Sequence, residues 1–126
     1  MAAVGYPPRF AHRRPVIADV RTLMPIEPSA AERTWFGVAP DGAEKDVVLR
    51  IGVPTAEPGG EWRSTVSLGV LESRTYDIAG VDAWQAISLA MRFAANRISH
   101  FAENGWKFYW ERGGEPALPE DLADAP

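Results

Sequence analysis

The chain has 126 residues and a mass of 13.8 kDa, enough for one domain with one modest core. No apolar run reaches the ~18 residues of a membrane span, and the start lacks the basic-then-apolar pattern of a signal peptide. We therefore expect a cytoplasmic protein without a membrane segment. The lack of cysteine excludes disulfides, thiolate nucleophiles and cysteine-based zinc sites, and only His12 and His100 could offer imidazole. We expect neither a metal nor a cofactor.

Charge and proline divide the chain into three parts. Residues 1–31 hold five prolines and four arginines against two acids, and they are predicted to form an amino-terminal arm. Residues 32–112 have the regular patterning of a folded domain. Residues 113–126 carry four acids and no basic residue, and they are predicted to form an acidic, irregular carboxyl-terminal tail. With a net charge of −4, the chain lacks the basic balance typical of proteins that bind phosphate backbones.

Alternating polar and apolar residues predict five strands, at 32–38, 44–53, 61–70, 74–79 and 106–110. In the second strand the residues predicted to face the core are Val47, Leu49, Ile51 and Val53; in the third they are Trp62, Val66, Leu68 and Val70. In the first strand Thr34, Phe36 and Val38 share one side, and Arg33 and Trp35 share the other. We place the second pair outside, away from the core.

A long helix is predicted from about Ala83 to Glu103. Asp82 and Gln85 fit a capping box, Val81 and Ala86 could form a hydrophobic staple, and Asn104-Gly105 suits the carboxyl end. An apolar stripe along one side is formed by Trp84, Ile87, Met91, Ala94, Ile98 and Phe101. Together these elements predict an α+β fold in two layers, an antiparallel β-meander of about five strands with the helix packed across one face.

The sequence gives little support for a catalytic site. The sequence contains neither a glycine-rich phosphate-binding loop nor a dinucleotide-binding motif. Asp77 and Asp82 could approach each other near the helix start, but a helix cap explains Asp82 better than a glycosidase pair does. His100 suits a solvated position or a helix-dipole partner at the helix end. A weak alternative remains an enzyme that uses these three residues; otherwise the sequence indicates no enzyme.

The outward face of the predicted sheet is the best candidate for a binding surface. Its mixture of arginine and aromatic side chains is typical of protein interfaces, and it could also serve single-stranded RNA. A plainer alternative is that arginine stems cover an open sheet face, with Trp35 half-buried by the amino-terminal arm. The other four tryptophans are predicted to pack in the core. The residues predicted to contact a partner are Arg33, Trp35, Arg50, Arg63, Lys107 and Tyr109, beside Val48 and Thr65.

The segment from Gly80 to Met91 resembles the G-[VI]-D-x-x-Q-A-[LI]-x-L-A pattern that opens the single helix in a family of small bacterial α+β domains of unknown function. Further likeness lies in the Pro40-Asp41-Gly42 turn, in Arg50-Ile51-Gly52 and in Gly60-Glu61-Trp62-Arg63. The resemblance covers about residues 31–112 and implies the same fold, without catalytic residues. Domains of this kind are associated with immunity proteins, which neutralise a secreted toxin.

The sequence thus leads to the hypothesis of a cytoplasmic, non-catalytic protein-binding domain, an immunity protein that occludes the active site of a cognate bacterial toxin. Either the outward sheet face or the acidic tail would make the contact, the tail being suited to a basic nuclease. The alternative is an accessory module that binds nucleic acid or a small ligand, although the acidic balance argues against nucleic acid.

Overall fold

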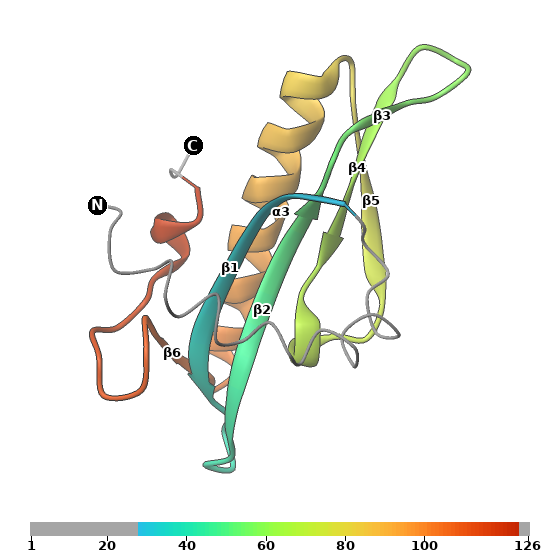
Figure 1. Ribbon diagram of the computed structural model, residues 1–126. Helices are drawn as coiled ribbons and strands as arrows, with labels where there is room; N and C mark the ends of the chain where they lie inside the picture. Colours follow the sequence, from blue (N-terminus) through green and yellow to red (C-terminus); the bar gives the residue numbers. More distant parts are fainter. Residues whose placement is uncertain (1–27, 124–126) are drawn as a thin grey trace.

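A computed structural model describes residues 28–123 and forms an open α+β arrangement, one sheet with one long helix against it (Figure 1). The predicted fold class is therefore confirmed. The arm predicted over residues 1–31, including His12, lies mostly outside the described residues. The elements are β1 (Ser29–Val38), β2 (Glu44–Gly52), β3 (Thr55–Ala56), β4 (Trp62–Ser67), the 3₁₀ turn η2 (Gly69–Leu71), β5 (Thr75–Gly80), α3 (Ala83–Glu103), β6 (Lys107–Tyr109) and η3 (Pro119–Asp121).

The sheet is a meander extended at one edge. β1 pairs with β2, β2 with β4 and β4 with β5, each antiparallel, and the short β3 pairs with β4 beyond the end of β2. After the helix, β6 returns to the opposite edge and pairs with β1. Residues 28–123 form six strands where five were predicted, because Thr55–Ala56 pairs with β4 in a segment for which no strand was predicted.

Helix α3 spans the predicted residues, with the predicted cap residue at its start and the predicted glycine just after its end. Asp82 accepts a hydrogen bond from the backbone nitrogen of Gln85 at 2.8 Å, which satisfies a donor that the first turn leaves open. The Gln85 side chain turns back and accepts from the backbone nitrogen of Val81. Gly105 has φ +107°, a left-handed geometry that glycine adopts readily. No helix within residues 28–123 is both long and apolar enough to cross a membrane.

The register of β1 reverses the faces predicted for this strand. Trp35 pairs with Val47, and Arg33 pairs with Leu49. Directly paired residues project to the same side of a sheet, so Arg33 and Trp35 lie on the helix side, not outside. Trp35 is 1% exposed. Phe36 and Val38 instead lie on the outer face, because β1 carries apolar groups on both sides and its pairing with β2 decides which side is covered.

Four apolar residues that were predicted to pack inside are exposed instead: Val53, Val70, Trp84 and Trp110. Each lies at or beyond the end of a regular element, where the opposite layer no longer covers it. The hydrophobic staple is also wrong, because Val81 is exposed. Its expected partner Ala86 is buried and packs its backbone on Gly80.

The carboxyl-terminal segment has little regular structure, as predicted, but it packs against the domain. Its chain reverses after β6, so that Ala117 donates a backbone hydrogen bond to Phe108 at 2.8 Å. Ala117 is buried, and Leu122 packs against the core cluster. This segment covers the part of the sheet near β6 that α3 does not reach, as its position beside β1 in Figure 1 shows.

Candidate functional site

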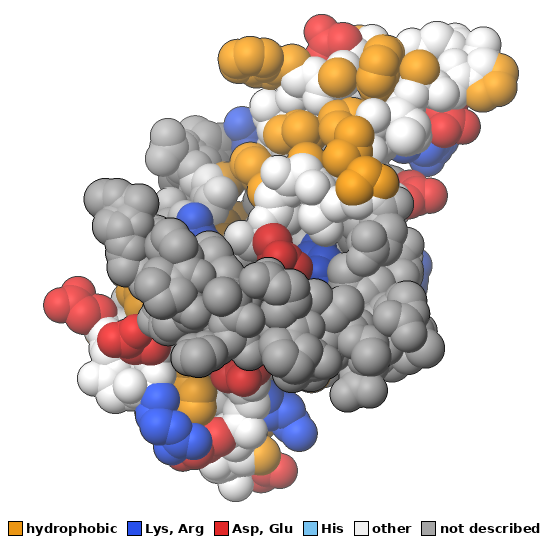
Figure 2. Space-filling view, in the orientation of Figure 1, with side chains coloured by type: hydrophobic (Ala, Val, Ile, Leu, Met, Phe, Trp, Pro, Cys, Tyr) orange, Lys and Arg blue, Asp and Glu red, His pale blue; other side chains and the backbone are white. Residues whose placement is uncertain are grey.

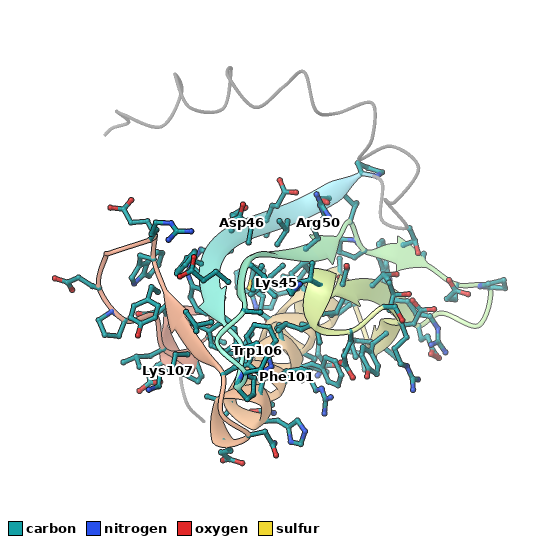
Figure 3. All side chains as sticks on the ribbon, turned by 90° about the horizontal axis from the view of Figure 1, so that it is seen from below. Lys45, Asp46, Arg50, Phe101, Trp106 and Lys107 are labelled. Atoms are coloured by element: carbon teal, nitrogen blue, oxygen red, sulfur yellow. The ribbon has the colours of Figure 1, made fainter. Side chains whose placement is uncertain are left out.

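The outer face of the sheet holds four of the six residues predicted to bind a partner. Arg50 and Arg63 project from β2 and β4, and Lys107 and Tyr109 project from β6 opposite Val38 and Phe36. Figure 3 shows Arg50 and Asp46 on the side of the sheet away from α3, with Phe101 and Trp106 on the helix side. Val48 and Thr65 share this outer face by the same alternation.

The arginines of this face form ion pairs with neighbouring carboxylates. Arg50 pairs with Glu32, Arg63 pairs with Glu61 at 2.8 Å, and near the β6 edge Arg112 pairs with Glu44. Exposed pairs of this kind contribute little to stability, about 0–1 kcal/mol each. They do cancel the local positive charge. The outer face is therefore a mixed, largely neutral surface and not a basic platform.

The other two predicted residues, Arg33 and Trp35, belong to an aromatic cluster on the helix side of the sheet near β6. Trp35 packs edge-on to Trp110 with ring centroids 5.6 Å apart, and it also contacts Phe108. The Arg33 guanidinium lies over Trp110 at 4.8 Å and over Trp35 at 5.9 Å. It donates to the backbone carbonyl oxygen of Asp121 at 3.1 Å. This pair therefore holds the carboxyl-terminal segment in place.

The three residues considered for a catalytic site, Asp77, Asp82 and His100, do not lie together. Asp77 accepts a hydrogen bond from Thr65 on the outer face, while Asp82 caps the helix. His100 lies in the last turn of α3, about 27 Å along the axis from Asp82 at ~1.5 Å per residue. In residues 28–123 no three histidine, cysteine, aspartate or glutamate side chains are grouped so that they could hold a metal ion.

The most exposed large apolar side chains lie at the end of the sheet where α3 begins. Trp84 is 84% exposed and Val81 is 73% exposed. Val53, also exposed, follows β2 at this same end. Figure 2 shows hydrophobic side chains gathered over the start of α3 and the β3–β4 turn. We call the set Val53, Val81 and Trp84 the apolar end.

Sequence reasoning missed the apolar end because Trp84 fits the helical stripe of the core. Only two residues, Val81 and Asp82, join β5 to α3, so the first helical turn begins beyond the last paired residues of the sheet. The signal that could have found it is Gly80, the last residue of β5. A Cβ there would lie 2.5 Å from the backbone nitrogen of Ala86, so the helix backbone meets the sheet one turn after its start.

Acidic residues surround the apolar end. Trp62 pairs with Gly80, which places Glu61 beside Val81, and Glu57 is hydrogen-bonded to Glu61 through the backbone. Asp82 follows Val81 directly. Of these carboxylates Glu61 pairs with Arg63. The apolar end therefore has a rim that is acidic on balance.

A second apolar feature is a shallow open groove with about 80 Å³ of internal space, between α3 and the inner face of β1 and β2. We call it the β1 groove. Its walls are apolar apart from Glu32 and Arg33, and its other lining residues are Ala31, Leu49, Ile51, Met91, Ala94 and Leu122. Because α3 packs mainly over β4 and β5, the helix forms only one wall of this groove.

A family model described as a domain of unknown function, DUF6968, matches residues 31–119. The match starts within β1 and ends at the first residue of η3, so it includes nearly the whole sheet, α3 and the first half of the carboxyl-terminal segment. No curated protein and no solved structure matches the chain significantly.

Proposed function

Because the chain belongs to the DUF6968 family, whose function is unknown, we propose its role from its surface: a non-catalytic protein-binding domain. In concrete form it is a cytoplasmic bacterial immunity protein that occludes the active site of a cognate secreted toxin. The observation that carries the protein-binding role is the 84% exposure of Trp84 beside Val81. The sequence predicted that the outer sheet face makes the main contact with the partner. We propose instead that the apolar end makes this contact.

An exposed tryptophan is the side chain most suited to anchor an interface. Tryptophan is enriched among the few residues that carry most of the binding energy in protein complexes. Burying a large aromatic side chain removes about 150–250 Å² from water, worth about 4–6 kcal/mol at ~25 cal/mol per Å². The backbone of Trp84 is held in a capped helical turn, so little backbone freedom is lost when a partner covers the side chain.

The charge around the apolar end supports the choice of partner. Glu57 and Asp82 border it, and the whole chain has a net charge of −4. Such a surface suits a partner that offers an apolar pocket within a basic surround, because opposite potentials speed encounter and fix the orientation. The active sites of enzymes that cleave nucleic acids have this kind of surround, since they receive a polyanion.

The nucleic-acid alternative has less support. The outer-face arginines that would contact phosphates are already paired with carboxylates, so binding would require breaking those pairs. Trp35, the aromatic residue proposed for base stacking, is buried. Stacking on a base needs an open ring face, which Trp35 lacks.

The test begins with a tagged chain purified from its native host, with mass spectrometry of any protein recovered in stoichiometric amount. Affinity for that purified partner is then measured for the wild type, for Trp84→Ser and for the control Val70→Ser. Val70 is a comparable exposed apolar residue, 58% exposed, but it lies in η2 at the opposite end of the sheet. We expect Trp84→Ser to weaken binding by about 30-fold or more, the effect of a hot-spot residue, and Val70→Ser to leave it unchanged.

Other outcomes separate the alternatives. If Arg50→Glu with Arg63→Glu weakens binding and Trp84→Ser does not, the outer sheet face is the interface. If Glu115→Gln with Glu120→Gln alone weakens binding, the carboxyl-terminal acids make the contact. A partner whose activity is unaffected by the bound chain would contradict the immunity role. Affinity for single-stranded nucleic acid that falls steeply with salt would favour the accessory-module alternative.

A further inference from the structure

The two edges of the sheet differ in how they end. At the β6 edge the chain turns back, and backbone hydrogen bonds join Ala117 to Phe108 and Trp110 to Glu115. At the opposite edge, among the described residues, β5 (Thr75–Gly80) pairs with β4 alone. Figure 1 shows β5 at the margin of the sheet. One side of β5 therefore presents backbone donors and acceptors that no described strand pairs.

The open edge of β5 lacks the features that usually protect an edge strand. Such strands carry proline, lysine or a bulge, or a further segment covers them. β5 contains neither proline nor lysine, and its register with β4 runs without a shift. Its one charged residue, Asp77, accepts a hydrogen bond from Thr65 of β4 and is thereby directed away from the free edge. β5 is thus a regular edge, suited to pair with another strand.

The side of α3 above this edge is apolar. The last residue of β5 adjoins the backbone of Ala86, and Tyr76 packs on Phe93 with ring centroids 4.7 Å apart. Ile78 lies midway between these two contacts and is therefore level with Leu89. Leu89 and Phe93, four positions apart, lie on the same side of the helix, and both are only half-buried. A strand that paired with β5 would bring its own second layer against this apolar side.

We propose that β5 pairs antiparallel with β5 of a second copy of this chain, so that the two sheets join into one and the two α3 helices pack side by side. The two-fold axis of such a dimer is perpendicular to the joined sheet. Each residue then stays on its own face, so the axis passes between one residue of β5 and the same residue of the second copy.

The residues of β5 favour the register in which Ile78 lies on this axis. Ile78 then lies opposite Ile78 of the second copy on the inner face, and Tyr76 lies opposite Gly80, where an aromatic ring covers a strand glycine. On the outer face Asp77 lies opposite the small Ala79. If Asp77 lay on the axis, two carboxylates would face each other, which destabilises a strand pair.

The position of α3 gives the two helices the spacing of a packed pair. Helix α3 lies over β4 and β5 about equally. Neighbouring strands are about 4.8 Å apart, so the helices of two copies joined through β5 would be about 9.6 Å apart. Packed helices are about 8–10 Å apart. Because Leu89 is level with the axis, the Leu89 side chains of the two copies would meet there, with Phe93 beside them.

The charges on this side of α3 are complementary between two copies. Among the described residues neither Arg92 nor Asp82 forms an ion pair. In antiparallel helices whose Leu89 residues meet, Arg92 of one copy lies within about one turn of Asp82 of the other. Trp84 lies about 140° around the helix from Leu89 and stays exposed. The inference therefore does not rest on the proposed function.

Sedimentation equilibrium of the full-length chain tests the proposal. We expect a species of twice 13.8 kDa that dissociates on dilution. Leu89→Glu places two carboxylates at the axis and should raise the dissociation constant of the dimer about 100-fold or more. The control Trp84→Ser changes the other side of the same helix and should leave this constant unchanged. Since Trp84→Ser is also the variant expected to lose the protein partner, the two proposals can fail separately.

Single engineered cysteines test the register, since the chain has no cysteine of its own. Ile78→Cys should form a disulfide between two copies in high yield, because residues directly opposite in paired strands are close enough for one. In the control Thr75→Cys the two cysteines would be roughly 20 Å apart at ~3.3 Å per residue, and little disulfide should form. This measurement also decides the matter if Leu89→Glu fails to fold.

Three results would overturn the proposal. The first is a wild-type chain that stays monomeric up to millimolar concentration. The second is a folded Leu89→Glu variant that dimerises as tightly as the wild type, which would place the interface on another surface. The third is equal cross-linking of Ile78→Cys and Thr75→Cys, which would show that β5 does not pair in this register.

Discussion

The guanidinium of Arg33 lies over the indole ring of Trp110, with its central carbon 4.8 Å from the ring centroid. A residue of the first strand is thereby linked to one just after the last strand, 77 positions later in the chain. The same guanidinium donates to the carbonyl oxygen of Asp121, so one side chain holds the carboxyl-terminal segment at two points. This contact makes that segment part of the folded domain.

Replacing Arg33 should loosen the carboxyl-terminal segment without unfolding the sheet. We expect Arg33→Ala to cost about 1–2 kcal/mol, through loss of a half-buried cation–π contact and of one hydrogen bond. Hydrogen exchange at the amides of Ala117 and Leu122 should rise by more than tenfold, while the amides of β2 keep their protection. Arg33→Lys should be intermediate, because an ammonium keeps the charge but not the planar fork. Unchanged exchange at Ala117 would contradict this role.

Two tryptophans should respond oppositely to truncation. Trp35→Ala removes a buried ring and should lower the free energy of unfolding by about 3–5 kcal/mol, as large core truncations do. Trp84→Ala removes an exposed ring and should change it by less than about 0.5 kcal/mol. Denaturant unfolding of both variants beside the wild type measures the difference. Equal losses would mean that the indole of Trp84 is covered in solution.

The close approach of α3 to β5 makes Gly80 sensitive to a single methyl group. A Cβ on Gly80 would lie 2.5 Å from the Ala86 backbone nitrogen and 2.8 Å from its Cα, and backbone atoms cannot move aside cheaply. Gly80→Ala should therefore destabilise the protein by about 1–3 kcal/mol, a typical cost of overpacking. Thermal unfolding checks this against Gly59→Ala, where nothing lies within 4 Å. A fully stable Gly80→Ala protein would show that helix and sheet pack less closely.

The helix cap offers a milder test. Asp82→Ala removes the acceptor for the Gln85 amide and should cost about 1 kcal/mol. Asp82→Asn keeps an acceptor oxygen at that position and should lose only a fraction of that amount. Urea denaturation curves of the two variants separate the cap from the charge. An equal loss in both would point to the carboxylate charge and not to the hydrogen bond.

The face of the sheet on which a site residue lies was predicted correctly only where its strand has one apolar side and one polar side. Arg50, Arg63, Lys107 and Tyr109 lie on the outer face, as predicted, because their strands have one apolar side and one polar side. Arg33 and Trp35 do not, because β1 carries apolar groups on both sides and alternation alone cannot choose between them. Only the pairing of Trp35 with Val47 decides that choice.

By itself the sequence determined the elements: the meander, the bounds and caps of α3, and the return of β6, since turn residues, period-two alternation and helical spacing are local properties. The tertiary structure alone decided which face of β1 is covered, that Trp84 extends past the sheet, and that the acidic segment after β6 packs on the core. The physical reason is that a side chain is buried only where a second surface of the protein covers it. A periodic pattern states which residues lie together on one side, but only the position and length of the opposing layer decide whether that side is removed from water.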